Sequence, residues 1–263
     1  METYKYIIDF YNDYDEDSRL TSKHGQVEFL TTMRYIEKYI KNGDRVLEIG
    51  AATGRYSHTL ARQGYKVDAV ELVEHNIDVF RKNTLPNEDI TITHGNALDL
   101  SAIPDNQYDI TLLLGPLYHL YTEEDKRQAL SEAIRVTKQG GVIFAAYVIS
   151  DVAVLEEGFC RNKFSVVEYI KNGLIDPETF ATVSEPKELF ELVRKENIDK
   201  LMSVFPTTRL HYVASNGLSQ LLRDTVDNMD DATFNLYLNY HFAVCEREDM
   251  VGFTSHALDI FKK

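Results

Sequence analysis

Tryptophan is absent from this sequence of 263 residues, and cysteine is scarce. The two cysteines, Cys160 and Cys245, lie far apart and form no Cys-x-x-Cys pair. Such a spacing indicates neither a disulfide framework nor a zinc site. The sequence therefore predicts two free, buried thiols and no metal centre.

Basic residues are also in short supply. The chain has 28 Lys and Arg against 42 Asp and Glu, which gives a formal net charge of -14. A charge of this sign repels phosphate backbones and anionic lipid surfaces. We therefore expect no nucleic-acid partner, and a small molecule that is neutral or cationic fits better.

Long apolar runs and a basic leader are missing as well. No stretch of about 18 consecutive apolar residues occurs, as a membrane-spanning helix would need. The first twenty residues, METYKYIIDFYNDYDEDSRL, are acidic, unlike the basic start of a secretory signal peptide. These features predict a cytoplasmic protein that does not associate with membranes.

The sequence does contain short apolar runs that alternate regularly with amphipathic segments. Residues 1–42 have a helical period and predict an N-terminal arm. Residues 43–150 alternate short Val/Ile/Leu runs with amphipathic helices, a pattern typical of a parallel sheet covered on both faces. Residues 151–263 predict a helical lid together with the last strands of the sheet. The expected fold is a doubly wound, mostly parallel α/β sheet.

Within the last region, the helical period is expected around 164–172, 185–197, 213–228 and 231–246. Two segments there read as strands, DKLMSVFPTTRL at 199–210 and SHALDIFKK at 255–263. These two strands would complete the central sheet, and the helices between them would form the lid.

The segment RVLEIGAATGRYS places a glycine turn between a strand and a helix. Backbone N–H groups at such a helix start bind anionic or polar ligands at the carboxyl edge of the sheet. Gly50 and Gly54 allow close approach of the main chain, and Glu71 ends the next strand, where a carboxylate can accept from ribose hydroxyls. Alternatively, the glycines serve only the turn and Glu71 is solvated.

Five segments in a fixed order carry a resemblance to a known family: VLEIGAATGRYS, VDAVELVEHNI, ITITHGNALDL, YDITLLLGPLYHL and AIRVTKQGGVIFAAYV. Together they cover about residues 44 to 149, and this series resembles that of class I S-adenosylmethionine-dependent methyltransferases. It is similar in particular to bacterial small-molecule methyltransferases with a Gly-Pro-x-Tyr-His-Leu turn after the fourth strand.

The resemblance implies a seven-stranded Rossmann-like sheet, S-adenosylmethionine as cofactor and S-adenosylhomocysteine as product. The methyl acceptor would be an oxygen, nitrogen or sulfur atom of a small molecule. The cofactor would lie in the 43–150 region, and the lid would select the acceptor. The chain would act as a monomer or a homodimer.

The resemblance also implies roles for single residues. Glu48 would orient the methionine end, Glu71 would bind the ribose, and Asn96 would bond the adenine, which Leu72 packs against. Tyr118 and His119 would lie near the transferred methyl group as catalytic residues. The full set of implied cofactor residues is Tyr11, Arg19, Glu48, Gly50, Ala51, Ala52, Gly54, Tyr56, Glu71, Leu72, Asn96, Ala97, Leu114 and Gly115.

Several of these assignments have alternatives. His119 is either a general base, a structural cap or a group that binds the acceptor, and Asn96 is either a cofactor ligand or a turn residue. Ala52 stands where the family usually has glycine, which is tolerable if φ is negative there. Arg19 either caps the cofactor or pairs with Asp15 or Glu16 on the surface.

In the last region, Tyr237, Tyr240 and His241 share a helix face, where they line a substrate pocket or the core of the lid. The wider polar and aromatic series of this region is Arg209, His211, Tyr212, Tyr237, Tyr240, His241, Cys245, Glu246 and Arg247. His211, His241 and Cys245 do not have the spacing of a metal site.

Two other functions stay open at this point. A nicotinamide-dependent oxidoreductase would use a similar layered fold, although the loop lacks the Gly-x-Gly-x-x-Gly spacing. A non-catalytic module that binds S-adenosylmethionine would keep the same cofactor residues. None of these motifs identifies the methyl acceptor.

Overall fold

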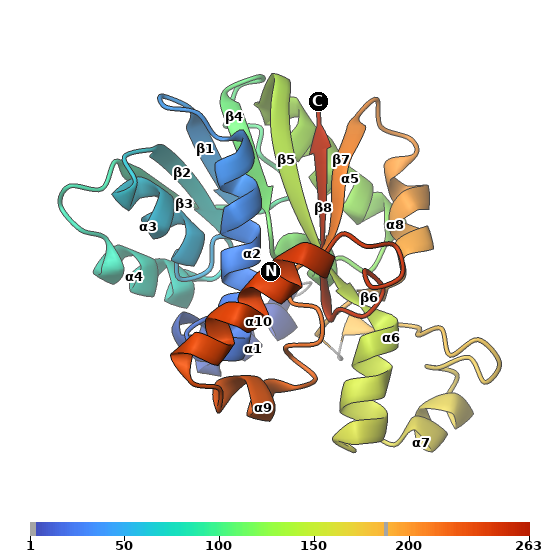
Figure 1. Ribbon diagram of the computed structural model, residues 1–263. Coiled ribbons are helices and arrows are strands. Elements are labelled where there is room, and N and C mark those ends of the chain that lie inside the picture. The colour runs from blue at the N-terminus through green and yellow to red at the C-terminus, as the bar shows by residue number, and fades with distance from the viewer. Residues whose placement is uncertain (1–3, 187–188) are drawn as a thin grey trace.

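The computed structural model of the chain describes residues 4–186 and 189–263 (Figure 1). At its centre is a sheet with the strand order β3-β2-β1-β4-β5-β8-β7, and the short strand β6 pairs with β5 in addition. The strands are β1 (Arg45–Ile49), β2 (Lys66–Glu71), β3 (Ile90–His94), β4 (Tyr108–Leu113), β5 (Thr137–Ile149), β6 (Leu192–Val193), β7 (Thr208–Ala214) and β8 (His256–Lys262).

The sheet is mostly parallel. Strands β1 to β6 pair in parallel, whereas β8 is antiparallel to both β5 and β7. The expected doubly wound α/β fold is thereby confirmed. The seven strands of the main order agree with the expected number, and β6, which has only two residues, is an addition.

Helices cover both faces of this sheet. The longer helices are α1 (Lys5–Asp13), α2 (Lys23–Tyr39), α3 (Arg55–Arg62), α4 (Glu74–Asn83), α5 (Glu123–Val136), α8 (Lys195–Met202) and α10 (Asp231–Val244). The apolar sides of α2 and α3 share one buried cluster with the strands, and those of α5 and α8 share another. Strands covered on both faces need continuous apolar runs, as in β1, which is buried at four of its five positions.

The remaining helices are short. They are η2 (Glu16–Ser18), η3 (Pro116–His119), α6 (Ser150–Ala153), η4 (Val154–Cys160), α7 (Val166–Lys171) and α9 (Arg223–Asp227). Figure 1 shows α1, α6, α7 and α9 on the lower side of the sheet, where β5 ends. Additional segments therefore gather at the carboxyl edge of the parallel strands, where ligands of such sheets bind.

Strand order reverses between β1 and β4. From β1 the chain passes to β2 and β3 on one side, and then crosses to β4 and β5 on the other. The loops after β1 and β4 therefore leave the sheet in different directions and open a crevice between them. The glycine turn, which the sequence predicted at the carboxyl edge of the sheet, follows β1 at this switch point.

The expected secondary structure of residues 185–213 is wrong in several places. The helix expected over 185–197 contains β6 and only the start of α8, and residues 187–188 lie outside the described residues. The strand expected from residue 199 begins only at Thr208, since α8 occupies residues up to Met202. The reason is a helical period in which Ile198, Leu201 and Met202 are buried on one side.

Two further expectations need correction. The helix expected over 213–228 is largely absent, because β7 extends to Ala214 and only α9 is helical in that range. Cys245 is buried as expected, but Cys160 is exposed at the end of η4. The arm expected over 1–42 forms α1, η2 and α2, and its first three residues lie outside the described part.

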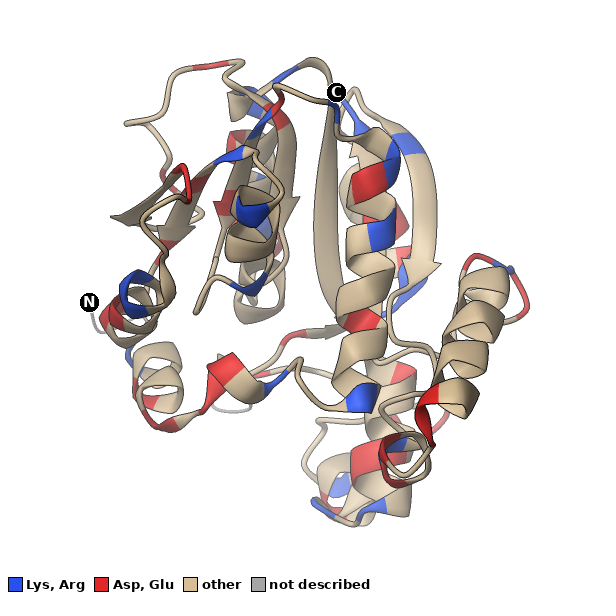
Figure 2. Cartoon of the chain, turned by 60° about the vertical axis from the view of Figure 1, so that its left-hand side comes forward, with Lys and Arg blue, Asp and Glu red and all other residues tan. Residues whose placement is uncertain are grey.

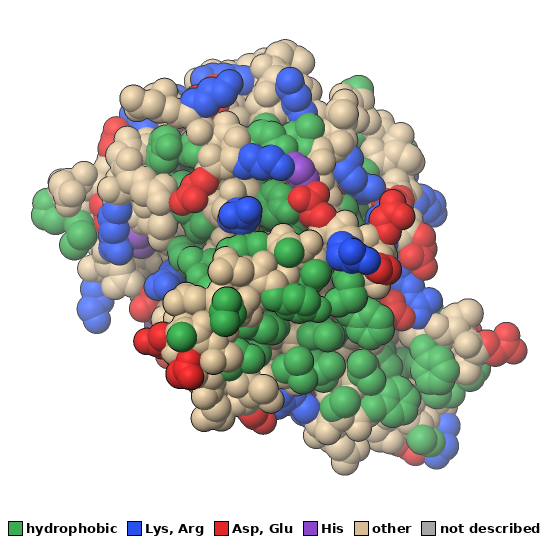
Figure 3. Space-filling model, in the orientation of Figure 1, with side chains coloured by type: hydrophobic (Ala, Val, Ile, Leu, Met, Phe, Trp, Pro, Cys, Tyr) green, Lys and Arg blue, Asp and Glu red, His purple; other side chains and the backbone are tan. Residues whose placement is uncertain are grey.

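Charged and apolar side chains are distributed differently on the surface. Figure 2 shows Lys and Arg interspersed with Asp and Glu along the helices. Figure 3 shows apolar side chains gathered on the lower part of one face. Among residues 4–186 and 189–263, no helix combines the length and the apolar character needed to cross a bilayer.

Candidate functional site

The loop after β1 is built on three residues with positive φ: Gly50 at 74°, Ala52 at 49° and Gly54 at 89°. The backbone N–H groups of Gly50 and Ala51 both donate to the carbonyl of Val70 at the end of β2. The condition stated for Ala52, a negative φ, is therefore not met. An alanine in this left-handed region carries strain of about 1 kcal/mol that glycine would not.

Glu71 holds the other side of this loop. One carboxylate oxygen accepts from the N–H of Ala52 at 2.8 Å, and the other accepts from the N–H of Val73 at 2.9 Å. Burial raises the pKa of Glu71 from its ordinary value, although the backbone N–H groups work in the opposite direction. The oxygen that accepts from Ala52 keeps a second lone pair for a ligand at the end of β2.

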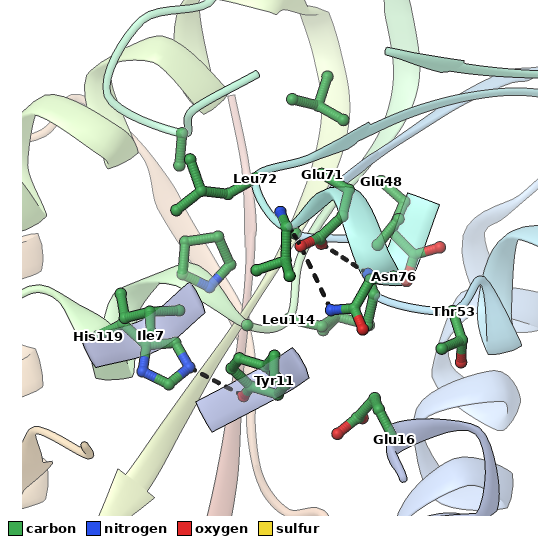
Figure 4. Close-up of a pocket in the computed structure, with 18 of the residues that line it drawn as sticks. Ile7, Tyr11, Glu16, Glu48, Thr53, Glu71, Leu72, Asn76, Leu114 and His119 are labelled. Carbon is green, nitrogen blue, oxygen red and sulfur yellow. Dashed lines mark hydrogen bonds between the residues drawn. The ribbon is translucent and has the colours of Figure 1, made fainter. Parts of the chain in front are cut away.

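Asn76 lies beside Glu71 and was not predicted. Its side-chain N–H₂ donates to Glu71 at 3.5 Å, and its side-chain oxygen is buried without a hydrogen-bond partner among the described residues. Figure 4 shows both side chains at the same wall of the cavity. A buried acceptor without a partner costs free energy unless a ligand or water satisfies it, so Asn76 points to a bound donor.

Glu48 lies under the loop at the end of β1. Its carboxylate accepts hydrogen bonds from the backbone N–H of Ser57, at 2.9 Å, and from the Ser57 hydroxyl. Glu48 thereby caps the first turn of α3. Burial raises the pKa of Glu48 to about 8. The side chain therefore stabilises the helix start directly and presents its remaining lone pairs to the cavity.

Asn96 follows β3 and forms a turn. Its side-chain oxygen accepts from the backbone N–H of Leu98 at 3.0 Å, and the residue also lines the cavity. The amide oxygen thus supports the turn, and the role of Asn96 as a cofactor ligand stays a prediction.

The strand β4 leads through Gly115 and Pro116 into η3, which carries Tyr118 and His119. The hydroxyl of Tyr118 donates to the carbonyl of Leu114 at 2.9 Å. His119 is buried, with one ring nitrogen 3.0 Å from the Tyr11 hydroxyl and the other 3.0 Å from the Leu189 carbonyl. Burial lowers the pKa of His119 to about 4.

A cavity of about 110 Å³ lies over the carboxyl ends of β1, β2 and β4, and we call it the first cavity (Figure 4). Tyr118, His119 and every predicted cofactor residue except Gly54 line it. Gly54 instead starts α3 against Phe80, whose ring carbon would lie 2.5 Å from an added Cβ. The role of these residues in cofactor binding stays a prediction.

Sequence reasoning missed several residues of this wall. Ile7, Thr53, Val73 and Asn76 line it, and so does Glu16 of η2. Asn76 could have been found only by its position in the sequence, five residues after Glu71, the acid that ends β2. Glu16 was considered only as a surface partner of Arg19.

A second cavity, of about 800 Å³, adjoins the first. The two share five lining residues, Tyr11, Glu16, Arg19, Leu20 and Tyr118. Arg19 is therefore not a surface residue. It pairs with Glu16 at 2.8 Å and with Glu28 of α2 at 3.1 Å at the junction of the two cavities.

The polar and aromatic series of the last region lies outside both cavities. His241 is buried, whereas Tyr240 is exposed, so the expected common face does not form. One ring nitrogen of His211 forms a hydrogen bond with the Tyr39 hydroxyl, and the other pairs with the Glu246 carboxylate. Both contacts lie away from the crevice. In residues 4–186 and 189–263, no group of three His, Cys, Asp or Glu side chains is arranged to hold a metal.

Comparison with known proteins agrees with this geometry. The sequence model of a family described as "Methyltransferase domain" matches residues 47–145. This part of the chain is thus similar to methyltransferase domains. It includes the loop after β1, Glu71, Asn76 and η3, and the match decides against the nicotinamide-dependent oxidoreductase.

Curated relatives match part of the chain. Glycine/sarcosine N-methyltransferase of Aphanothece halophytica is 29% identical over 136 residues, which are 51% of this chain and 51% of that protein. The S-adenosyl-L-methionine-dependent Diels-Alderase iccD of Talaromyces variabilis is 31% identical over 103 residues, 38% of this chain and 34% of that protein. The chain thus matches a third to a half of the length of these relatives.

Among solved structures, a protein from Pyrococcus horikoshii OT3 has the same fold. Its TM-score is 0.62 at 16% identity, and the superposition covers 97% of this chain and 98% of that chain. The shared fold therefore extends beyond the sheet to the segments before β1 and after β5.

Proposed function

We propose that this chain transfers a methyl group from S-adenosylmethionine to an oxygen, nitrogen or sulfur atom of a small molecule. The observation that carries the proposal is the junction of two cavities. The first lies on the methyltransferase loop, and the second meets it at Tyr11, Glu16, Arg19 and Tyr118. A donor site and an acceptor site in direct contact are what a transfer reaction requires.

The residues of the first cavity fit the cofactor. Glu71 offers carboxylate lone pairs to the ribose hydroxyls, and the unpartnered oxygen of Asn76 can accept from a hydroxyl or an amino group. Leu72 and Ala97 provide apolar surface for the adenine, and Glu48 lies where it can accept from the methionine amine. The family match and these acceptors support S-adenosylmethionine at this site.

When bound, the cofactor supplies a methyl group on a positively charged sulfur. This methyl group would pass to a lone pair of the acceptor. In such a displacement, alignment and exclusion of water contribute most. Tyr118 suits this task, because its hydroxyl is fixed on Leu114 and burial raises its pKa, which keeps it protonated.

The helix α1 covers the first cavity closely. Tyr11 and Ile7 of α1 line it, and the remaining volume is about 110 Å³. Because drug-sized ligands occupy pockets of about 300 Å³ or more, we expect α1 to move outward as the cofactor enters. Hydrogen exchange of α1, measured with and without S-adenosylhomocysteine, tests this expectation, and identical exchange would contradict it.

Calorimetric titration with S-adenosylmethionine, S-adenosylhomocysteine and NAD tests the cofactor assignment. We expect both sulfur nucleosides to bind and NAD not to bind; the reverse result would overturn the proposal. Incubation with methyl-labelled cofactor and pooled small metabolites then tests transfer. Label in a metabolite supports the enzyme, whereas tight binding without any transfer would make the chain a binding module.

A further inference from the structure

We infer that the methyl acceptor is an amphipathic molecule with an amine or hydroxyl group at one end and a bulky apolar body at the other. This inference rests on the proposed function and concerns the second cavity. Its volume of about 800 Å³ is within the range of pockets for drug-sized ligands, roughly 300 to 1,000 Å³. The two ends of this cavity differ in chemical character.

The polar end lies next to the first cavity. Arg19 and Glu16 line both cavities, and Glu28 is joined to Arg19 at 3.1 Å. His256 follows, with its ring nitrogen 3.5 Å from Glu28 and its ring centre 6.2 Å from that of Tyr118. The reacting group of an acceptor has to be at this end, because only here do the cavities meet.

The charges at this end favour a hydrogen-bond donor. Two carboxylates, Glu16 and Glu28, face one guanidinium, Arg19. Burial lowers the pKa of His256, against the effect of Glu28, so the imidazole adds no positive charge near neutral pH. The cluster therefore carries a net negative charge. An amine or hydroxyl can donate to these oxygens, whereas a carboxylate would be repelled.

The other end of the second cavity is apolar. The region between β5 and β6 contributes Phe164, Tyr169, Leu174, Ile175 and Val183. The rings of Phe164 and Tyr169 are stacked with centres 4.4 Å apart. Aromatic and aliphatic side chains of this kind gain free energy by burying apolar ligand surface.

Charged side chains beside the apolar end are already paired with each other. Arg223 bonds Glu156, and Lys163 lies 2.6 Å from Glu157. These pairs leave no single charge to attract a second ionic group of the ligand. The acceptor body that fits this end is therefore neutral.

A matched set of probes tests the inference on the whole chain with S-adenosylhomocysteine bound. The probes are naphthylethylamine, naphthylethanol, naphthylacetate and ethylamine, and binding is measured by calorimetry or ligand-observed NMR. We expect the naphthyl amine and alcohol to bind at least about tenfold tighter than naphthylacetate, a ratio equal to about 1.4 kcal/mol. Ethylamine, which lacks the apolar body, should bind at least about tenfold more weakly than naphthylethylamine.

A pair of tryptophan variants locates the binding. Leu174→Trp fills the apolar end, whereas Val167→Trp lies on α7 at an exposed position that does not line the second cavity. We expect only Leu174→Trp to weaken naphthylethylamine binding, by about tenfold or more, with unchanged affinity for S-adenosylhomocysteine. If Leu174→Trp does not fold, Glu28→Gln replaces it and should reduce the preference for the amine over the carboxylate.

The outcomes separate the two proposals. Absence of S-adenosylhomocysteine binding would overturn the proposed function itself. If S-adenosylhomocysteine binds but naphthylacetate binds as tightly as the amine, or Leu174→Trp leaves naphthylethylamine binding unchanged, the inference about the acceptor is wrong while the proposed function stands.

Discussion

One ring nitrogen of His119, Nε2, lies 3.0 Å from the hydroxyl oxygen of Tyr11. The other, Nδ1, lies 3.0 Å from the carbonyl oxygen of Leu189. A carbonyl can only accept, so Nδ1 carries the proton and Nε2 accepts from Tyr11. With both nitrogens engaged, His119 fastens α1 to η3, and a positioning role fits this geometry better than a general base.

His119 should therefore remain neutral across the physiological range. Burial lowers its pKa to about 4, so the ring should bind no proton between about pH 5.5 and about pH 8. Nuclear magnetic resonance of the imidazole protons measures this, and spectra of His119→Asn identify the signal. A titration midpoint above about pH 6 would contradict this prediction and would favour His119 as a general base.

Asn76→Ala should weaken binding of S-adenosylhomocysteine by about 1 kcal/mol, or roughly fivefold, because a ligand donor loses its acceptor. Glu71→Ala should weaken it by about 1 to 3 kcal/mol, since a charged acceptor is lost. Asp78→Ala is the control on the same helix as Asn76, because this side chain is exposed and does not line the first cavity. Calorimetry gives the three affinities. Wild-type affinity in both site variants would remove these residues from the cofactor site.

Ala52→Gly should stabilise the fold slightly or leave it unchanged. Relief of the positive φ at Ala52 gains about 1 kcal/mol, and the added freedom of glycine in the unfolded chain offsets part of it. Ala51→Gly should instead destabilise by about 0.5 to 1 kcal/mol, because φ at Ala51 is not positive. Urea unfolding compares the two, and an equal loss in both variants would show that Ala52 is not strained.

The parts of the molecule that the sequence predicted well are those governed by local patterns. Continuous apolar runs located β1, β2, β4 and β5, because strands buried on both faces need them. The carboxyl edge of these strands then placed Glu71 and His119 together at one cavity. The topology of the sheet thus brings motifs that are separate in the sequence together at one edge, where they form a site.

Other features depend on contacts that no local pattern contains. Residues 199–210 are polar and apolar in a mixed order, and they divide between the end of α8 at Met202 and the start of β7 at Thr208. Arg19 and Glu28 are nine residues apart, and the turn between η2 and α2 brings them together at 3.1 Å. The positive φ of Ala52 likewise occurs together with a hydrogen bond from its N–H to Glu71, nineteen residues away.

Acid should destabilise the wild-type protein more than the variant His241→Asn. His241 is buried, and burial lowers its pKa from 6.5 to about 4 although its bond with Ser215 works against this. The unfolded chain then binds a proton below about pH 6.5 that the folded chain does not bind, so stability is lost as pH falls from about 6.5 to about 4. Between pH 7 and pH 5 this contribution of His241 to the free energy of unfolding amounts to about 2 kcal/mol.

His119, His256 and Glu48 titrate in both proteins, so their effects cancel in the comparison. Urea unfolding at the two pH values measures the difference, and parallel losses in wild type and variant would show that His241 is not buried as a neutral imidazole.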